Sequence, residues 1–201
     1  MTADLMAEIT ATRRELADVL AGLPAESWDA PSLCAGWRVR EVVAHITMPF
    51  RYSTGRFLVE LARSGMRFHR MSNRCAHRDA GMPAADLVSA VRDNAANPWR
   101  PPGGGYEGAL VHDVIHGLDV TVALGIDRPI PAERMRIVLD GVTKPGALKH
   151  FGVDLSGVEL RADDLDWSFG TGRTVSGPAR ELALVLCGRT LPAGRLAGMA
   201  A

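Results

Sequence analysis

The sequence ALVHDVIHGLDV, residues 109–120, places two histidines four positions apart inside an otherwise apolar run. Residues at positions i and i+4 of an α-helix are stacked neighbours, with Cβ atoms about 5–6 Å apart. His112 and His116 can therefore direct both imidazoles at one point, as paired ligands of an H-x-x-x-H metal site do. The same spacing also arises where buried histidines only form hydrogen bonds within the protein.

Two side chains rarely hold a metal tightly, so a third ligand has to come from another segment. In WRVREVVAHITM, residues 37–48, the apolar residues have helical spacing and His45 lies beside their stripe. Facing helices of a bundle can bring such side chains together, and bundle interiors commonly hold metal sites. His45, His112 and His116 thus form a candidate site for zinc, with nickel or iron also compatible. The alternative is three unrelated core or boundary histidines.

The composition of the whole chain excludes several classes of protein. The chain has 201 residues, 47% of them hydrophobic, with 23 basic and 23 acidic side chains. This zero net charge argues against a nucleic-acid binder that works through phosphate neutralisation. No apolar run approaches a membrane span and the first residues are not signal-like, so we expect a soluble, cytoplasmic protein with no membrane partner. Cys34, Cys75 and Cys187 are expected to be reduced thiols.

The hydrophobic pattern predicts a mainly α-helical chain. Apolar residues recur at helical spacing in the segments 2–21, 37–48, 49–65, 82–96, 106–124 and 131–142. After Gly146, alternating apolar residues in 158–177 predict two or three short strands, and 179–188 is expected to be a helix. We therefore predict two domains, a helical bundle at 1–146 and a small α+β domain at 147–201.

Charged and polar residues mark further candidate positions. Five arginines spaced three or four residues apart predict one stripe along a helix: Arg63, Arg67, Arg70, Arg74 and Arg78. Such a stripe is usually a solvated face, and its functional interpretation is a docking surface for an anionic co-substrate, with Asn73 beside it. His69, His77 and His150 have no apolar neighbour pattern and are expected at the surface.

Two acidic residues accompany the histidine pair. Asp113 lies about 100° around the helix from His112, so we expect a surface or helix-pairing residue rather than a base. Asp119 follows His116 by three positions. It can support that ligand through a hydrogen bond or form a salt bridge to a neighbouring helix.

Three stretches resemble the DinB-like metal-binding bundles, in the branch of mycothiol-dependent maleylpyruvate isomerases. GWRVREVVAHIT (36–47) resembles the second helix, with a ligand histidine at the place of His45. ALVHDVIHGLDV resembles the fourth helix, which supplies two ligands four residues apart. His112 stands where the isomerase itself has glutamate, which gives the three-histidine form of other DinB-like proteins. VSGPARELALVLCGRTLPAGRLAG (175–198) resembles the end of the small C-terminal domain.

The resemblance implies a DinB-like four-helix bundle with a small C-terminal α+β appendage. It also implies a metal-dependent thiol transferase or isomerase, in which a metal on His45, His112 and His116 activates mycothiol for attack on an electrophilic small molecule. Mycothiol is a low-molecular-weight thiol of actinobacteria, and Asn73 and Arg74 are its candidate contacts. The alternative is a non-catalytic bundle that binds a metal or a small molecule. Either protein is expected to be a monomer or a homodimer.

Overall fold

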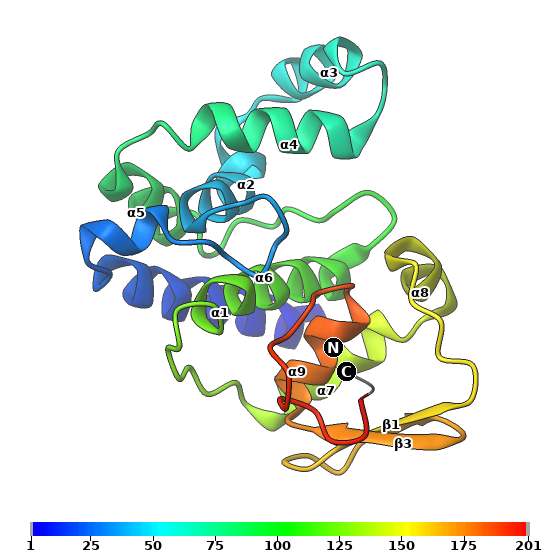
Figure 1. Ribbon diagram of the computed structural model, residues 1–201. Coiled ribbons are helices and arrows are strands. Elements are labelled where there is room, and N and C mark those ends of the chain that lie inside the picture. The colour runs from blue at the N-terminus through cyan, green and yellow to red at the C-terminus, as the bar shows by residue number, and fades with distance from the viewer. Residues whose placement is uncertain (1, 200–201) are drawn as a thin grey trace. The chain divides into compact units, whose positions relative to one another are not determined.

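The protein, represented by a computed structural model, is described over residues 2–199 and has two compact units that divide between Gly125 and Ile126. The chain is mainly helical, with a small three-stranded sheet in the second unit (Figure 1), which confirms the predicted fold class. Helix α7 (Ala132–Val142), grouped with the bundle in the sequence prediction, belongs to the second unit because it packs on α9 (Ala179–Leu186). Such units need not be folding domains, so the domains 1–146 and 147–201 stay a prediction. Within residues 2–199, no helix has the length and apolar character needed to cross a membrane.

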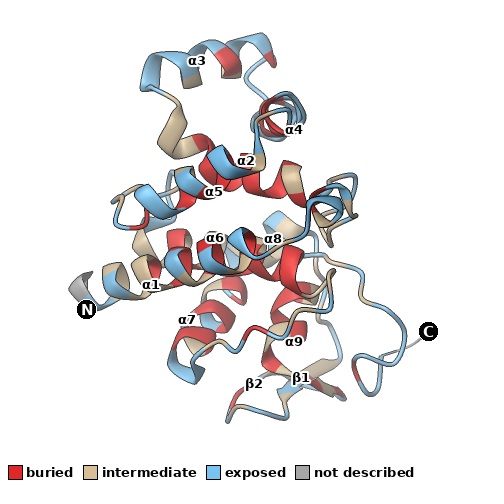
Figure 2. Ribbon diagram, turned by 90° about the vertical axis from the view of Figure 1, so that its left-hand side faces the viewer, coloured by how far each residue is buried: buried red, intermediate tan, exposed pale blue. Residues whose placement is uncertain are grey.

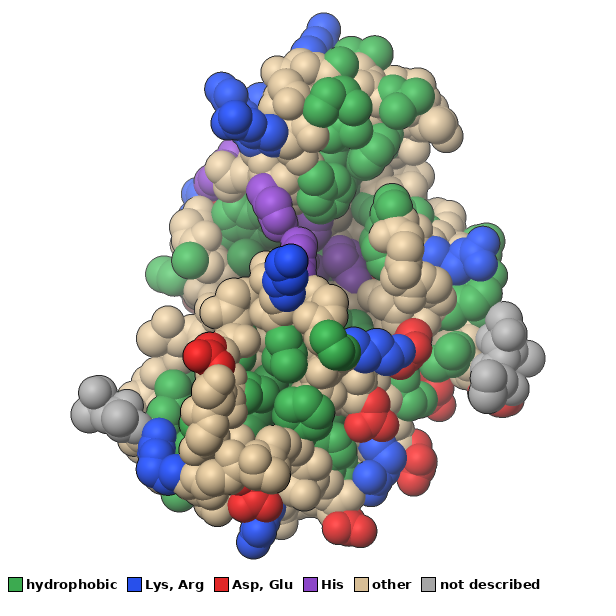
Figure 3. Space-filling view, turned by 90° about the vertical axis from the view of Figure 1, so that its right-hand side faces the viewer, with side chains coloured by type: hydrophobic (Ala, Val, Ile, Leu, Met, Phe, Trp, Pro, Cys, Tyr) green, Lys and Arg blue, Asp and Glu red, His purple; other side chains and the backbone are tan. Residues whose placement is uncertain are grey.

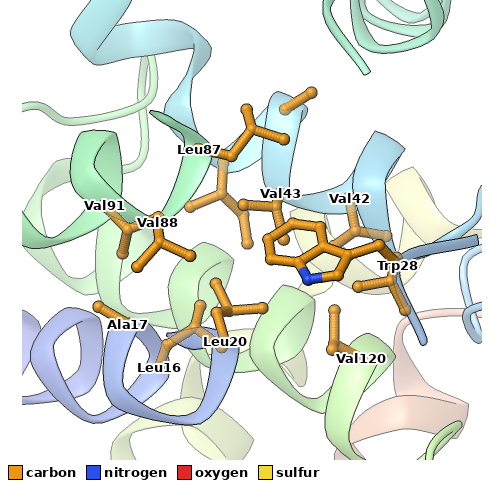
Figure 4. Packing of buried hydrophobic residues seen from close by; sticks show 13 residues of the cluster. Leu16, Ala17, Leu20, Trp28, Val42, Val43, Leu87, Val88, Val91 and Val120 are labelled. Atoms are coloured by element: carbon orange, nitrogen blue, oxygen red, sulfur yellow. The ribbon is translucent and has the colours of Figure 1, made fainter. Parts of the chain in front are cut away.

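Four helices form the core of the first unit: α1 (Thr2–Ala21), α2 (Val39–Arg51), α5 (Ala84–Asp93) and α6 (Gly105–Thr121). Helix α1 packs against α5 and α6, and α2 packs against the same two helices. Buried leucines and valines from these helices surround Trp28 of the short 3-10 helix η1 (Ala25–Asp29), as Figure 4 shows. Each fully buried Leu or Val contributes about 1.5–3 kcal/mol, so this cluster holds the two metal-motif helices, α2 and α6, in place.

Two further helices, α3 (Thr54–Arg63) and α4 (Phe68–Asp79), connect α2 to α5. Helix α4 packs on α2, whereas α3 is exposed over most of its length (Figure 2). The prediction of one continuous arginine stripe is wrong, because the chain leaves the helical conformation between Arg63 and Arg67. Gly65 and Met66 both have positive φ there, a conformation that a right-handed helix cannot contain.

The second unit contains α7, α8 (Pro145–Phe151), a three-stranded sheet and α9. Strand β1 (Val158–Ala162) lies between β2 (Ser168–Gly170), to which it is antiparallel, and β3 (Arg173–Gly177), to which it is parallel. Helix α9 packs on β1, β3 and α7. Gly172 has a φ of +128°, and a Cβ there would lie 2.2 Å from the Gly157 carbonyl oxygen. Only glycine fits this turn without a shift of the backbone.

Candidate metal centre

The structure brings together the three histidines that the sequence analysis selected. His45 on α2 and His112 and His116 on α6 each offer a ring nitrogen, and these nitrogens lie within 4.8 Å of one another. The ring centroid of His116 lies 4.8 Å from that of His45 and 4.8 Å from that of His112. The Nε2 atoms of His45 and His112 are 3.2 Å apart. That these residues bind a metal stays a prediction.

Local sequence explains how α2 presents His45. The backbone N–H of Arg38 donates to Glu41 Oε2 at 2.8 Å, and this capping contact fixes where the helix begins. Val39, Val42 and most of the other apolar residues of the helix are buried. His45 follows Val42 by three positions, so it lies at the edge of that buried stripe and is 8% exposed. It can therefore face α6 from inside the first unit.

Two buried carboxylates orient the histidines of α6. Asp113 Oδ1 lies 2.9 Å from Nδ1 of His112, and Asp119 Oδ2 lies 2.9 Å from Nδ1 of His116. An ionised carboxylate only accepts hydrogen bonds, so in the neutral imidazole the proton is on Nδ1 and Nε2 keeps its lone pair. A carboxylate behind an imidazole is typical of metal-binding histidines, because it fixes the ring and raises the basicity of the other nitrogen. Of the two predicted roles for Asp119, the structure shows the hydrogen bond to His116.

Asp113 also joins two helices, and the alternative that it lies at the surface is wrong. It is 1% exposed because α1 covers it, and Arg13 of α1 donates from Nε to Asp113 Oδ2 at 2.6 Å. The Nη1 atom of Arg13 donates to the backbone carbonyl oxygens of residues 94, 95 and 97, the last at 2.7 Å. One buried guanidinium thus connects α1, the carboxylate behind His112 and the loop that leads to Trp99.

His45 is held by Ser72, a residue that no sequence pattern singled out. Ser72 Oγ of α4 lies 3.0 Å from Nδ1 of His45, and Ser72 is 6% exposed. A serine hydroxyl can accept a hydrogen bond from Nδ1–H, and in that tautomer the Nε2 lone pair of His45 faces that of His112. A cation between two such lone pairs relieves their repulsion. Met71 and Cys75 are four residues apart in this polar segment, and that spacing was the sequence signal of a helix with one buried face. Both residues are buried in the structure.

A buried carboxylate anchors α4, and with it Ser72, to the end of α2. Asp79 accepts hydrogen bonds from Tyr52 Oη at 2.7 Å, from Arg51 Nη1 at 2.9 Å and from Arg78 Nε at 2.9 Å. Burial raises the pKa of Asp79, but the hydrogen bonds from Tyr52, Arg78 and Arg51 outweigh it and hold the pKa below its usual value. The carboxylate therefore stays charged and fixes α4 at neutral pH.

Asn73 and Arg74, the predicted contacts for the thiol co-substrate, have partners within the protein. Asn73 Oδ1 accepts a hydrogen bond from Trp37 Nε1 at 2.7 Å. Arg74 donates from Nη2 to Glu60 Oε2 at 2.5 Å, and Glu60 is 4% exposed. The charge of Arg74 is thus balanced inside the protein, and a role for either residue in thiol binding stays a prediction. As predicted, His69, His77 and His150 are exposed. None of the three cysteines, all of which lie in the described part of the chain, is in a disulfide.

Aromatic rings and a cavity border the three histidines. The ring centroid of Trp37 lies 5.1 Å from that of His45, and the ring centroid of Trp99 lies 5.2 Å from that of His112. A cavity of about 460 Å³ adjoins His45 and His112, which is within the range of small-molecule sites. Figure 3 shows histidine side chains at the surface beside a patch of hydrophobic side chains. The arrangement can hold a cation and a small molecule side by side.

Comparison with known proteins gives the family and agrees with the fold. Residues 9–98 match the family model of the mycothiol maleylpyruvate isomerase N-terminal domain, a segment that includes His45 and ends before α6. The crystal structure of a histidine-to-alanine mutant of the mycothiol-dependent maleylpyruvate isomerase has a TM-score of 0.61 at 14% identity, over 94% of this chain and 90% of that chain. The structure of that isomerase without the mutation has a TM-score of 0.55 at 14% identity, over 100% and 95%. No curated protein matches the chain. The resemblance to the mycothiol maleylpyruvate isomerase family is therefore confirmed by the match over residues 9–98.

Proposed function

We propose that this protein is a metal-dependent thiol transferase or isomerase that uses mycothiol. In this proposal a divalent metal, zinc before nickel or iron, is held by His45, His112 and His116. One observation carries it: an oxygen atom engages Nδ1 of each imidazole, and the ligand nitrogens converge beside an apolar cavity. The family match and the fold support the choice of thiol chemistry.

The residues present suit such a metal. Three neutral imidazoles with an open side match the donor set of catalytic zinc sites, and nickel and iron accept the same ligands. Asp113 and Asp119 bring negative charge behind two of the rings, where it offsets the charge of a cation. Histidines that only form hydrogen bonds with each other do not require the carboxylates of Asp113 and Asp119 behind them.

The chain's own residues would bind and orient the reactants. A divalent metal held by the three histidines would lower the pKa of a thiol at the site, so that the thiol loses its proton to solvent and is a thiolate at neutral pH. Trp37 and Trp99 border the histidines and limit the access of water, while the cavity holds the electrophile next to them. Isomerisation requires addition to an activated double bond, rotation and elimination, whereas S-transfer stops after addition. For isomerisation, the site has to let the thiol adduct rotate about its former double bond. For S-transfer, no such rotation is needed.

The alternative is a non-catalytic bundle that binds a metal or a small molecule. It is favoured by the pairing of Arg74 with Glu60 and of Asn73 with Trp37. Nη2 of Arg74 and Oδ1 of Asn73 are thus engaged within the protein rather than directed to a ligand.

Metal content tests the site itself. Protein purified without a histidine tag should contain about one divalent metal per chain by elemental analysis, and His112→Ala should lose most of it. His69→Ala, on the exposed side of α4, is the matched control and should keep the metal. Normal metal content in both His45→Ala and His112→Ala would overturn the site.

Mycothiol binding separates the enzyme from the non-catalytic bundle. Cobalt-substituted protein should develop a sulfur-to-metal charge-transfer band when mycothiol is added, and the affinity should rise with pH because the thiol must lose its proton to bind. If no band appears while cobalt occupies the three-histidine site, the thiol chemistry is refuted and the non-catalytic bundle stands.

A further inference from the structure

The cavity beside His45 and His112 has a mainly apolar lining. Its walls come from α2, α3, α4 and residues 99–102, with aromatic rings supplied by Phe57, Phe68 and Trp99. Among the residues that the structure describes, none of those lining the cavity is acidic. Apolar surface buried on binding contributes about 25 cal/mol per Å², so these walls favour a ligand with an apolar body of the size of an aromatic ring.

Arg100 is the one arginine or lysine among the described lining residues. Its guanidinium carbon lies 4.8 Å from the centroid of the Tyr106 ring, and no carboxylate in residues 2–199 forms a salt bridge with it. The arginines near Tyr52 differ, since Arg51 and Arg78 are both paired with Asp79. The positive charge at the cavity is thus available to one anionic group of a ligand.

Resting on the proposed function, we infer that the electrophile is an aryl-bearing monocarboxylate, with its ring against Phe57, Phe68 and Trp99 and its carboxylate at Arg100. A small dicarboxylate fits this cavity less well for two reasons. It leaves the aromatic walls without an apolar partner, and it brings a second negative charge for which the lining provides no second arginine.

Three probe ligands, trans-cinnamate, fumarate and cinnamamide, separate the contribution of the aromatic ring from that of the carboxylate. Isothermal titration calorimetry should show trans-cinnamate binding at least roughly tenfold more tightly than fumarate, because only cinnamate has a ring to bury. Cinnamate should also bind about fivefold more tightly than the neutral cinnamamide, the size of effect expected for a partly exposed ion pair. The titrations are made with zinc-loaded protein and with chelator-treated protein, because a carboxylate can also coordinate a metal.

Variants assign the effects to residues. Arg100→Gln should abolish the preference for cinnamate over cinnamamide and leave cinnamamide affinity unchanged, with and without metal. The matched control is Arg92→Gln on α5, where the arginine pairs with Asp18 and does not line the cavity; it should keep the preference. Phe57→Ala should weaken cinnamate and cinnamamide equally.

The outcomes distinguish this inference from the proposed function. Absence of binding by all three probes, equal binding of fumarate and cinnamate, or an unchanged preference in Arg100→Gln would overturn the inference. If the wild-type protein binds no metal or no mycothiol but still prefers cinnamate to fumarate and cinnamamide, the proposed function is refuted. The inferred specificity of the cavity then still stands.

Discussion

Replacing Asp119 by asparagine tests how strongly the site depends on the hydrogen bond behind His116. Asp119 is fully buried and its Oδ2 lies 2.9 Å from His116 Nδ1. Asparagine keeps an oxygen that can accept the same hydrogen bond, but it removes the negative charge. The substitution therefore isolates the electrostatic part of the support that His116 receives.

The magnitude follows from the two kinds of hydrogen bond. A hydrogen bond to a charged group contributes about 1.5–3 kcal/mol and a neutral one about 0.5–1.5 kcal/mol. Asp119→Asn should thus cost about 1–1.5 kcal/mol of zinc binding, which raises the Kd roughly tenfold. Asp119→Ala removes the bond altogether and should cost up to about a hundredfold, the upper end of such effects in known metal sites.

Competition with a chromophoric chelator measures these zinc affinities. Asp18→Asn, at an exposed residue paired with Arg92 on the bundle surface, is the control and should match the wild type. The essential result is that zinc affinity decreases in the order wild type, Asp119→Asn, Asp119→Ala. If both Asp119 variants bind zinc as tightly as the wild type, the carboxylate does not support a metal ligand and the reasoning fails.

Three further predictions concern stability. Arg13→Met should lower the free energy of unfolding by about 3–5 kcal/mol, because Asp113 stays buried without its cation; a loss below about 1 kcal/mol in urea, with chelator present, contradicts this. Gly172→Ala should lower the thermal stability of the second unit, because its Cβ would lie 2.2 Å from a backbone oxygen, whereas Gly146→Ala, with open space around it, should not; circular dichroism melting compares them. The lowered pKa of Asp79 adds stability that is present above the ordinary value of 3.8 and is lost as the pH falls through the lowered one. In Asp79→Asn, the free energy of unfolding measured against pH should lack this loss of stability at acid pH. An unchanged pH profile would count against the hydrogen bonds around Asp79.

Local spacing made part of the site predictable. An α-helix fixes the geometry of positions i and i+4, so the approach of His112 and His116 followed from the sequence. The position of His45 beside the apolar stripe of its helix indicated that it faces the interior. The motifs around these residues also carried the family resemblance, and the match over residues 9–98 confirms it for the segment that contains His45.

Other features depended on how separate segments pack. Nothing local to Ser72 or Arg13 indicated that one would hold His45 and the other would hold the carboxylate behind His112. The interruption of the arginine stripe involved Gly65, where the predicted segment 49–65 ends, and Met66, a residue type that rarely adopts positive φ. The three- and four-residue spacing of the arginines did not reveal it.

The sequence by itself determined the helical class, the two metal-motif helices and the histidines that they carry, because helix periodicity and residue chemistry are local properties. Only the tertiary structure decided which oxygen stands behind each imidazole, which arginine borders the cavity and where the compact units divide. These features follow from the burial of many side chains at once, and a contact between residues 13 and 113 exists only when the whole bundle around it has formed.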